Sequence, residues 1–194
     1  MPYHEGQRAM QDARGTRKLA DRVLDVTLRT EFTEDDKLFI ETRTMFFLAT
    51  AGPDGQPECS YKGGGPGFVR VTGPSTLVFP DYDGNGTMRS LGNLTANPKL
   101  GMILIDFDDQ KRLQINGRGK VLDDPMDFPG ARGTVQVTAD AIFPKCPRYI
   151  HKGGGRELSH FTPEVGKEEP TPDWKYWKEF NDVLPDGDPA ASAG

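Results

Sequence analysis

The sequence has few of the residues on which several classes of protein depend. Its 194 residues include only two cysteines, Cys59 and Cys146, which lie far apart. This excludes a disulfide framework and a C-x-x-C metal or redox motif, and it indicates a reducing compartment. The longest apolar run, residues 45–51, is too short to cross a bilayer, and the N-terminus has no apolar segment of signal-peptide length. We therefore expect a cytoplasmic protein with no metal site and no membrane partner.

A positive net charge is also lacking. The formal net charge is −5, which argues against a non-specific nucleic-acid binder. Hydrophobic residues make up only 35% of the chain, which also has 23 glycines and 16 prolines. This composition favours a β-rich core with many turns over a compact helical protein. The length suits one domain with a substantial core.

The stretch from Phe79 to Pro98 predicts the end of a strand, a turn and a helix. Residues 76–79 are apolar and β-prone, and residues 83–86, Asp-Gly-Asn-Gly, have the composition of a turn. Apolar residues then recur at one-turn spacing as Met88, Leu91 and Leu94. We expect Pro98 to end the helix, because proline cannot continue it.

The start of this helix is a candidate anion site. The first N–H groups of a helix have no partner within it, and neighbouring glycines let a ligand approach the backbone closely. Arg89 adds a positive charge and Ser90 a hydroxyl in the first turn. These features predict a phosphate site. A plain joint between strand and helix, with an exposed arginine, explains the pattern equally well.

Two helices are expected before the strands. Residues 17–30 place Leu19 and Val23 near one face, as an amphipathic helix does. Residues 33–36, Thr-Glu-Asp-Asp, predict the start of a second helix with a hydroxyl N-cap and three acids in its first turn. Both the unpaired N–H groups and the helix dipole favour this arrangement. We expect the second helix to end near Thr44.

From residue 45 the pattern becomes that of β-strands. A strand at 45–51, a turn at 52–55 and a strand at about 56–61 predict a hairpin. Residues 100–107 are continuously apolar and predict a strand that is buried on both faces. Further strands are expected at 68–72, 75–79, 112–122 and 134–143. At least seven strands without regular β-α alternation indicate a mainly β protein, an antiparallel barrel or sandwich.

Several short segments occur in the order found in one known family. They are Phe-Phe-Leu-Ala-Thr at 46–50, Ser-Tyr-Lys-Gly-Gly at 60–64, Pro-Gly-Phe-Val-Arg-Val at 66–71, Gly-Asn at 84–85, Ser-Leu-Gly-Asn-Leu at 90–94, Asn-Pro at 97–98 and Leu-Gln-Ile-Asn-Gly-Arg-Gly at 113–119. Over about residues 33–151 the chain resembles the pyridoxamine 5′-phosphate oxidase-like, FMN-binding split-barrel family. Residues 146–150, Cys-Pro-Arg-Tyr-Ile, resemble a segment of its flavin-nucleotide-binding branch.

This resemblance implies a six-stranded antiparallel split barrel with peripheral helices. It also implies a homodimer with one FMN in each of two clefts at the dimer interface. Arg89 would then be the cationic ligand of the FMN phosphate. Asn85, Ser90 and Asn93 would be its polar neighbours. FMN is expected and FAD is not, because the chain has no G-x-G-x-x-G unit between a strand and a helix.

The resemblance assigns the rest of the flavin to other strands. Ser60, Tyr61 and Lys62 would run along the ribityl chain and the pyrimidine edge, where the lysine would stabilise negative charge on reduced flavin. Arg112 and Gln114 would approach from a neighbouring strand or subunit. Each of these side chains also has a plain interpretation as a polar surface residue.

Two departures from the family pattern bear on the reaction. True pyridoxamine phosphate oxidases carry Ser-Arg-Lys at the phosphate helix and end in an Arg-Leu-x-Pro strand that holds the substrate phosphate. This chain has Met-Arg-Ser at 88–90 and nothing similar at its end. The resemblance therefore implies an FMN-dependent oxidoreductase for an unknown small-molecule redox substrate, and not a true pyridoxamine phosphate oxidase. Cys146, Arg148 and Tyr149 are weaker candidates for lining the substrate cleft, and a surface segment without chemistry is the alternative.

Other functions remain open at this point. One alternative is a non-catalytic flavin-nucleotide carrier or sensor, and another is a barrel that binds a deazaflavin or haem. A haem would call for an axial ligand, and His4, His151 and His160 all lie outside the predicted barrel. We expect an N-terminal helical arm at 1–32, the barrel domain at 33–151 and a partly mobile C-terminal extension at 152–194.

Overall fold

The computed structural model describes residues 3–82, 86–153, 171–180, 182–184, 186–188 and 190–191. Contacts divide the chain into two compact units. The barrel unit comprises residues 29–146, and the terminal unit comprises residues 1–28 together with residues 147–194. The three-part division expected from the sequence stays a prediction.

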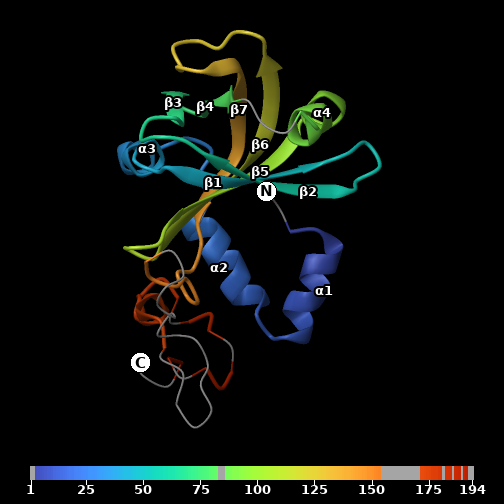
Figure 1. The fold of residues 1–194 in the computed structure, drawn as a ribbon. Helices are drawn as coiled ribbons and strands as arrows, with labels where there is room; N and C mark the ends of the chain where they lie inside the picture. The colour runs from blue at the N-terminus through green and yellow to red at the C-terminus, as the bar shows by residue number, and fades with distance from the viewer. Residues whose placement is uncertain are drawn as a thin grey trace. The chain divides into compact units, whose positions relative to one another are not determined.

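The barrel unit is built on one antiparallel sheet with the strand order β2-β1-β5-β6-β7-β4-β3 (Figure 1). The strands are β1 (Met45–Ala51), β2 (Pro57–Gly63), β3 (Arg70–Gly73), β4 (Thr76–Tyr82), β5 (Lys99–Asp106), β6 (Lys111–Leu122) and β7 (Ala131–Pro144). The mainly β, antiparallel architecture is therefore confirmed. All seven strands expected from the residue pattern are present, whereas the family resemblance implied six. β3, with four residues, is the shortest of the seven.

The sheet curls so that its two halves face each other. Phe46 on β1 packs edge-on against Phe79 on β4, with ring centroids 5.0 Å apart, although β1 and β4 are separated by three strands in the sheet order. Phe68, from the loop between β2 and β3, stacks on Phe46 at 5.8 Å. β2 and β3 stand at the two ends of the order, so the barrel is not closed. This split leaves one edge of β2 without a neighbouring strand in the described residues.

Residues 100–107 do not form a strand buried on both faces. On β5 the inner residues Leu100, Met102 and Leu104 are buried, whereas the outer residues Ile103 and Ile105 are only half-buried. The reason is the alternation of side chains along a strand, which sends every second residue to the outer face of the curled sheet. That expectation was wrong for the outer face.

Two helices belong to the barrel unit. α3 (Glu34–Glu41) begins as expected at Thr33, whose side chain accepts the N–H of Asp36 while Asp36 accepts the N–H of Thr33. It ends before Thr42, slightly earlier than the sequence indicated. α4 (Arg89–Ala96) is the helix expected before Pro98. α3 packs against β3, and α4 packs across β1, β2 and β6.

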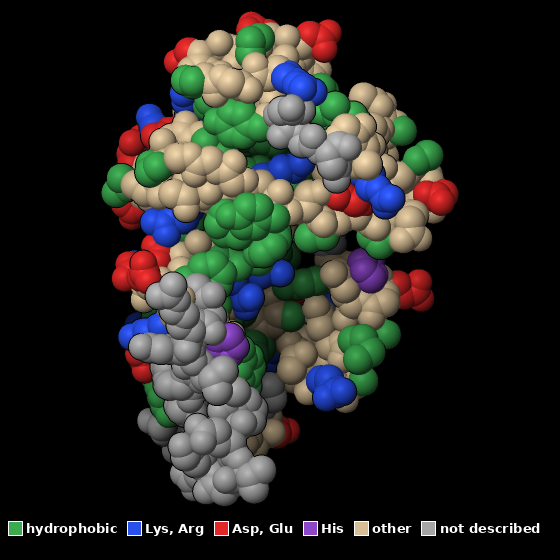
Figure 2. Space-filling view, in the orientation of Figure 1, with side chains coloured by type: hydrophobic (Ala, Val, Ile, Leu, Met, Phe, Trp, Pro, Cys, Tyr) green, Lys and Arg blue, Asp and Glu red, His purple; other side chains and the backbone are tan. Residues whose placement is uncertain are grey.

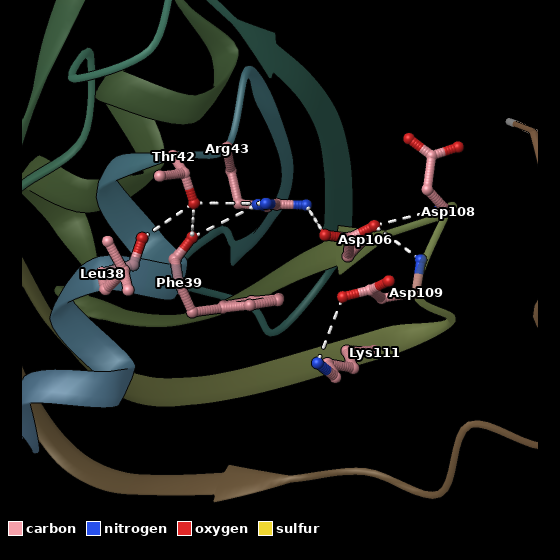
Figure 3. Close-up of polar contacts among 8 residues, drawn as sticks. All are labelled: Leu38, Phe39, Thr42, Arg43, Asp106, Asp108, Asp109 and Lys111. Atoms are coloured by element: carbon pink, nitrogen blue, oxygen red, sulfur yellow. Dashed lines mark hydrogen bonds and ion pairs between the residues drawn. The ribbon is translucent and has the colours of Figure 1, made fainter.

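An ion pair joins the end of α3 to the β5–β6 turn (Figure 3). The guanidinium of Arg43 pairs with the carboxylate of Asp106, and the Arg43 Nε also donates to the Phe39 carbonyl at 3.2 Å. The other carboxylate oxygen of Asp106 accepts the N–H groups of Asp108 and Asp109 at 2.9 and 3.0 Å. Asp106 therefore ties the helix and shapes the turn at the same time.

The terminal unit contains α1 (Glu5–Ala13), α2 (Arg17–Thr27) and the short 3-10 helix η1 (Asp173–Tyr176). The sequence predicted α2 and missed α1. Neither helix buries a residue, but α1 has Met10 as its one large apolar residue and so lacks the repeated apolar spacing by which α2 was recognised. Its remaining signal is a capping box, in which the backbone N–H of Gln7 donates to the His4 side chain and the backbone N–H of His4 donates to the Gln7 side chain.

Candidate functional site

A carboxylate surrounded by hydroxyls lies beneath the start of α4. Glu58 on β2 accepts hydrogen bonds from Thr50 Oγ1 at 2.9 Å, from Ser90 Oγ at 3.1 Å and from Ser60 Oγ. The Ser60 and Ser90 hydroxyl oxygens are 2.9 Å apart. Asn93 adds an N–H to Thr50 Oγ1 at 3.0 Å. We call these five residues the Glu58 cluster.

The alternation and register of β2 place its members. Successive side chains of a strand point to opposite faces, so Glu58, Ser60 and Lys62 share one face. In the pairing of β1 with β2, Glu58 lies opposite the buried Thr50, and Ser60 lies opposite the buried Leu48. That face is therefore the inner one, which α4 covers.

The neighbours of Glu58 stabilise its negatively charged form. Partial burial alone would raise the pKa of Glu58, but the hydroxyl donors Ser60, Thr50 and Ser90 and the positive charge of Lys62 together lower the pKa below its usual value. Glu58 is therefore an anion at neutral pH.

The first turn of α4 leaves a positive charge exposed. Met88 occupies the N-cap position with a left-handed φ of 49° and makes no side-chain capping bond. Arg89 follows as the first helical residue, is exposed, and its side chain has no hydrogen bond or ion pair with the rest of the described chain. Ser90, one residue further, is buried and points into the Glu58 cluster. The helix start thus presents a cation and uncapped N–H groups outward and a hydroxyl inward.

Close packing fixes α4 in this position. Leu94 is buried against β6 at Gly119, where a β-carbon would come within 3.1 Å of the Leu94 side chain and 2.8 Å of Leu100. The missing side chain at Gly119 therefore lets the helix approach the sheet. This contact holds the first turn of α4 over β1 and β2.

The other predicted flavin residues lie on the outer face of the sheet. Tyr61 points away from Ser60 and Lys62 and packs edge-on against Phe47, with ring centroids 6.0 Å apart. On β6, Gln114 donates to Asn116 Oδ1 at 2.8 Å, and Arg112 donates to the Cys146 carbonyl at 2.6 Å. The structure therefore brings Ser60, Ser90 and Asn93 together and separates them from Tyr61, Arg112 and Gln114.

The remaining predicted residues are placed as follows. Asn85 lies outside the described residues. Cys146 is half-buried at the end of the barrel unit, whereas Arg148 and Tyr149 belong to the terminal unit, where the Arg148 guanidinium lies 5.9 Å from the Tyr149 ring centroid. A cleft lined by these three residues stays a prediction.

Glu58 and Thr50 were missed by the sequence interpretation. The available signal was the period of two along β2, which puts Glu58 on the same face as Ser60 and Lys62.

Within the described residues, no three His, Cys, Asp or Glu side chains are grouped so that they could hold a metal ion. None of the described helices is both long and apolar enough to span a membrane.

Comparison with known proteins identifies the family. Residues 32–166, which are more than half of the chain, match the family model described as pyridoxamine 5′-phosphate oxidase. The chain belongs to this family. A search among curated proteins found no match.

Solved structures with a similar fold have low sequence identity to the chain. A putative pyridoxamine 5′-phosphate oxidase from Lactobacillus delbrueckii is 20% identical, with 59% of this chain and 95% of that chain covered and a TM-score of 0.47. An FMN-binding protein from Syntrophomonas wolfei is 12% identical, with 73% and 96% covered and a TM-score of 0.44. The haem storage protein HutZ from Vibrio cholerae is 14% identical, with 59% and 95% covered and a TM-score of 0.40.

Proposed function

We propose that this protein is a cytoplasmic FMN-binding flavoprotein that acts as an oxidoreductase on a small molecule. The observation that carries the proposal is the first turn of α4, where an exposed Arg89, whose side chain has no partner among the described residues, stands beside uncapped helix N–H groups. A helix start with an adjacent arginine suits a phosphate monoester, because the N–H groups, the helix dipole and the guanidinium all favour negative charge. Membership in the family supports the same cofactor.

The residues of the barrel unit fit the phosphate end of FMN only in part. In the part of the chain that the structure describes, the Arg89 side chain and the first backbone N–H groups of α4 are available to a phosphate, whereas Ser60 and Ser90 already donate to Glu58. Lys62 lies on the same face of β2 and supplies a second positive charge. Bound FMN would supply electron or hydride transfer, and the chain would supply its position and polarity.

We also propose that two copies of the chain assemble as a homodimer. The outer face of the sheet carries a row of side chains in register across four strands: Tyr61, Phe47, Ile103 and Gln114. Figure 2 shows hydrophobic side chains at the surface around β1. A two-fold axis would bury this face against its own copy.

The experiment that tests the cofactor is identification of the flavin that the purified protein retains. We expect the released cofactor to co-migrate with FMN on chromatography. Recovery of FAD alone, or no flavin binding at micromolar concentration, would contradict the proposal. Absorption spectra taken before and after addition of NADH or NADPH then separate an oxidoreductase from a carrier, because only the enzyme turns over with such an electron donor, whereas dithionite reduces the flavin of either and gives the spectrum of the fully reduced protein.

A further inference from the structure

The hydroxyl groups of the Glu58 cluster have no protons left for a phosphate. Each serine or threonine hydroxyl donates one hydrogen bond. Thr50 donates its proton to Glu58, and so do Ser60 and Ser90. A phosphate dianion accepts hydrogen bonds and donates none, so Ser60 and Ser90 could serve it only by releasing a partly buried carboxylate.

The carboxylate also places a negative charge next to the anion site. Ser90 is the second residue of α4, so Glu58 lies one hydrogen bond away from the first helical turn. That turn is where the helix dipole attracts anions. Lys62 shares the inner face of β2 with Glu58 and forms no ion pair with it in the described residues.

We propose that Glu58 is a specificity-determining residue that limits the affinity of the α4 site for the phosphate of FMN. The inference rests on the proposed function. Glu58 opposes the phosphate by its charge and withholds the hydroxyls of Ser60 and Ser90, which leaves Arg89 and the helix N–H groups to bind it. The site should therefore hold FMN only modestly better than riboflavin, which has no phosphate, and should release its cofactor readily.

A structural role alone does not need this charge. Glu58→Gln keeps the size of the side chain and removes its charge: the amide oxygen can still accept from hydroxyls, whereas the amide nitrogen is a donor and replaces one acceptor oxygen, which costs stability. Glu58→Gln therefore separates the two roles. A role confined to packing predicts that the variant loses stability and FMN affinity together, whereas the proposal predicts that stability falls and FMN affinity rises.

The test compares the dissociation constants of FMN and riboflavin for the full chain, measured by quenching of flavin fluorescence. Glu58→Gln should bind FMN about tenfold more tightly, as expected when a unit charge is removed at the effective dielectric of a protein surface, and should change riboflavin binding by less than about twofold. The matched control is Glu34→Gln, which removes the same charge from an exposed position on α3 and should leave both constants unchanged.

Each outcome decides the proposal. If wild type binds FMN and Glu58→Gln binds it equally or more weakly, the role of Glu58 is refuted while the proposed function stands. If neither protein binds FMN or riboflavin, both proposals fail. Should the variant not fold, wild type alone suffices: a preference for FMN over riboflavin of about tenfold or less supports the inference, and a larger preference overturns it.

Discussion

Replacement of Asp106 by asparagine should destabilise the protein by about 1–2 kcal/mol. The Arg43 and Asp106 side chains are only 20% and 14% exposed. Exposed ion pairs contribute about 0–1 kcal/mol, whereas breaking a buried pair costs about 3–5 kcal/mol. The loss should fall between these limits, because Arg43 keeps its bonds to Phe39 and Thr42 and an asparagine at 106 can still accept the two turn N–H groups (Figure 3).

Urea unfolding measures this loss as a lower midpoint with an unchanged slope. The matched control is Asp109→Asn in the same turn. The Asp109 carboxylate pairs with Lys111 at 3.2 Å, but the two side chains are 65% and 68% exposed. We expect this control to change the stability by less than about 0.5 kcal/mol.

The effect of Asp106→Asn should depend on pH. Burial alone would raise the pKa of Asp106, but the Asp109 N–H, the charge of Arg43 and the Asp108 N–H lower the pKa below its usual value. A carboxyl whose pKa is lower in the folded protein than in the unfolded chain stabilises the fold at pH values above its pKa in the unfolded chain. This contribution is lost as the pH falls through its pKa in the folded protein. The difference between wild type and variant should be constant from about pH 7 to 5 and shrink below about pH 4. Equal stabilities at pH 7, or a difference that persists undiminished at pH 3, would refute the reasoning.

Three further predictions concern the flavin site and the assembly. Arg89→Ala should weaken FMN binding about 10- to 150-fold in a fluorescence titration, because it removes a charge-assisted phosphate contact; an unchanged constant would show that Arg89 is an ordinary surface residue. Sedimentation equilibrium should give twice the 21.4 kDa chain mass, and a monomer that retains flavin would contradict the dimer. An oxygen-coupled assay should find no efficient oxidation of pyridoxamine phosphate, since the chain has no Arg-Leu-x-Pro end for the substrate phosphate; turnover near about 1 per second would show that this absence is irrelevant.

Much of the barrel could be predicted because its signals are local. The apolar strand at 45–51, the hairpin turn after it and the N-cap at Thr33 are all present where the sequence placed them. The outer face of β5 was misjudged because a run of apolar residues does not say which of them a curled sheet turns outward. α1 was missed because Met10 is its one large apolar residue, which gives no helical apolar spacing to recognise.

The candidate site was harder to predict, because its residues meet only through tertiary packing. Ser90 could be placed on the first turn of a helix from sequence alone, but its contact with Glu58 depends on how α4 crosses β1 and β2. Gly119 permits that crossing and lies about thirty residues away in the chain. A motif defined by short segments therefore identified the helix start but not the carboxylate beneath it.

The separation of the predicted flavin residues is itself informative. β2 and β6 are three positions apart in the sheet, about 14 Å at the usual strand spacing, and Gln114 faces outward whereas Ser60 faces inward. A flavin held at the start of α4 can reach both faces of β2, because no described strand covers the free edge of β2. Arg112 and Gln114 of the same chain lie two intervening strands away from β2. If those two residues contact flavin in the site of a second copy, their assignment as flavin ligands requires the homodimer, whereas the homodimer does not require their assignment.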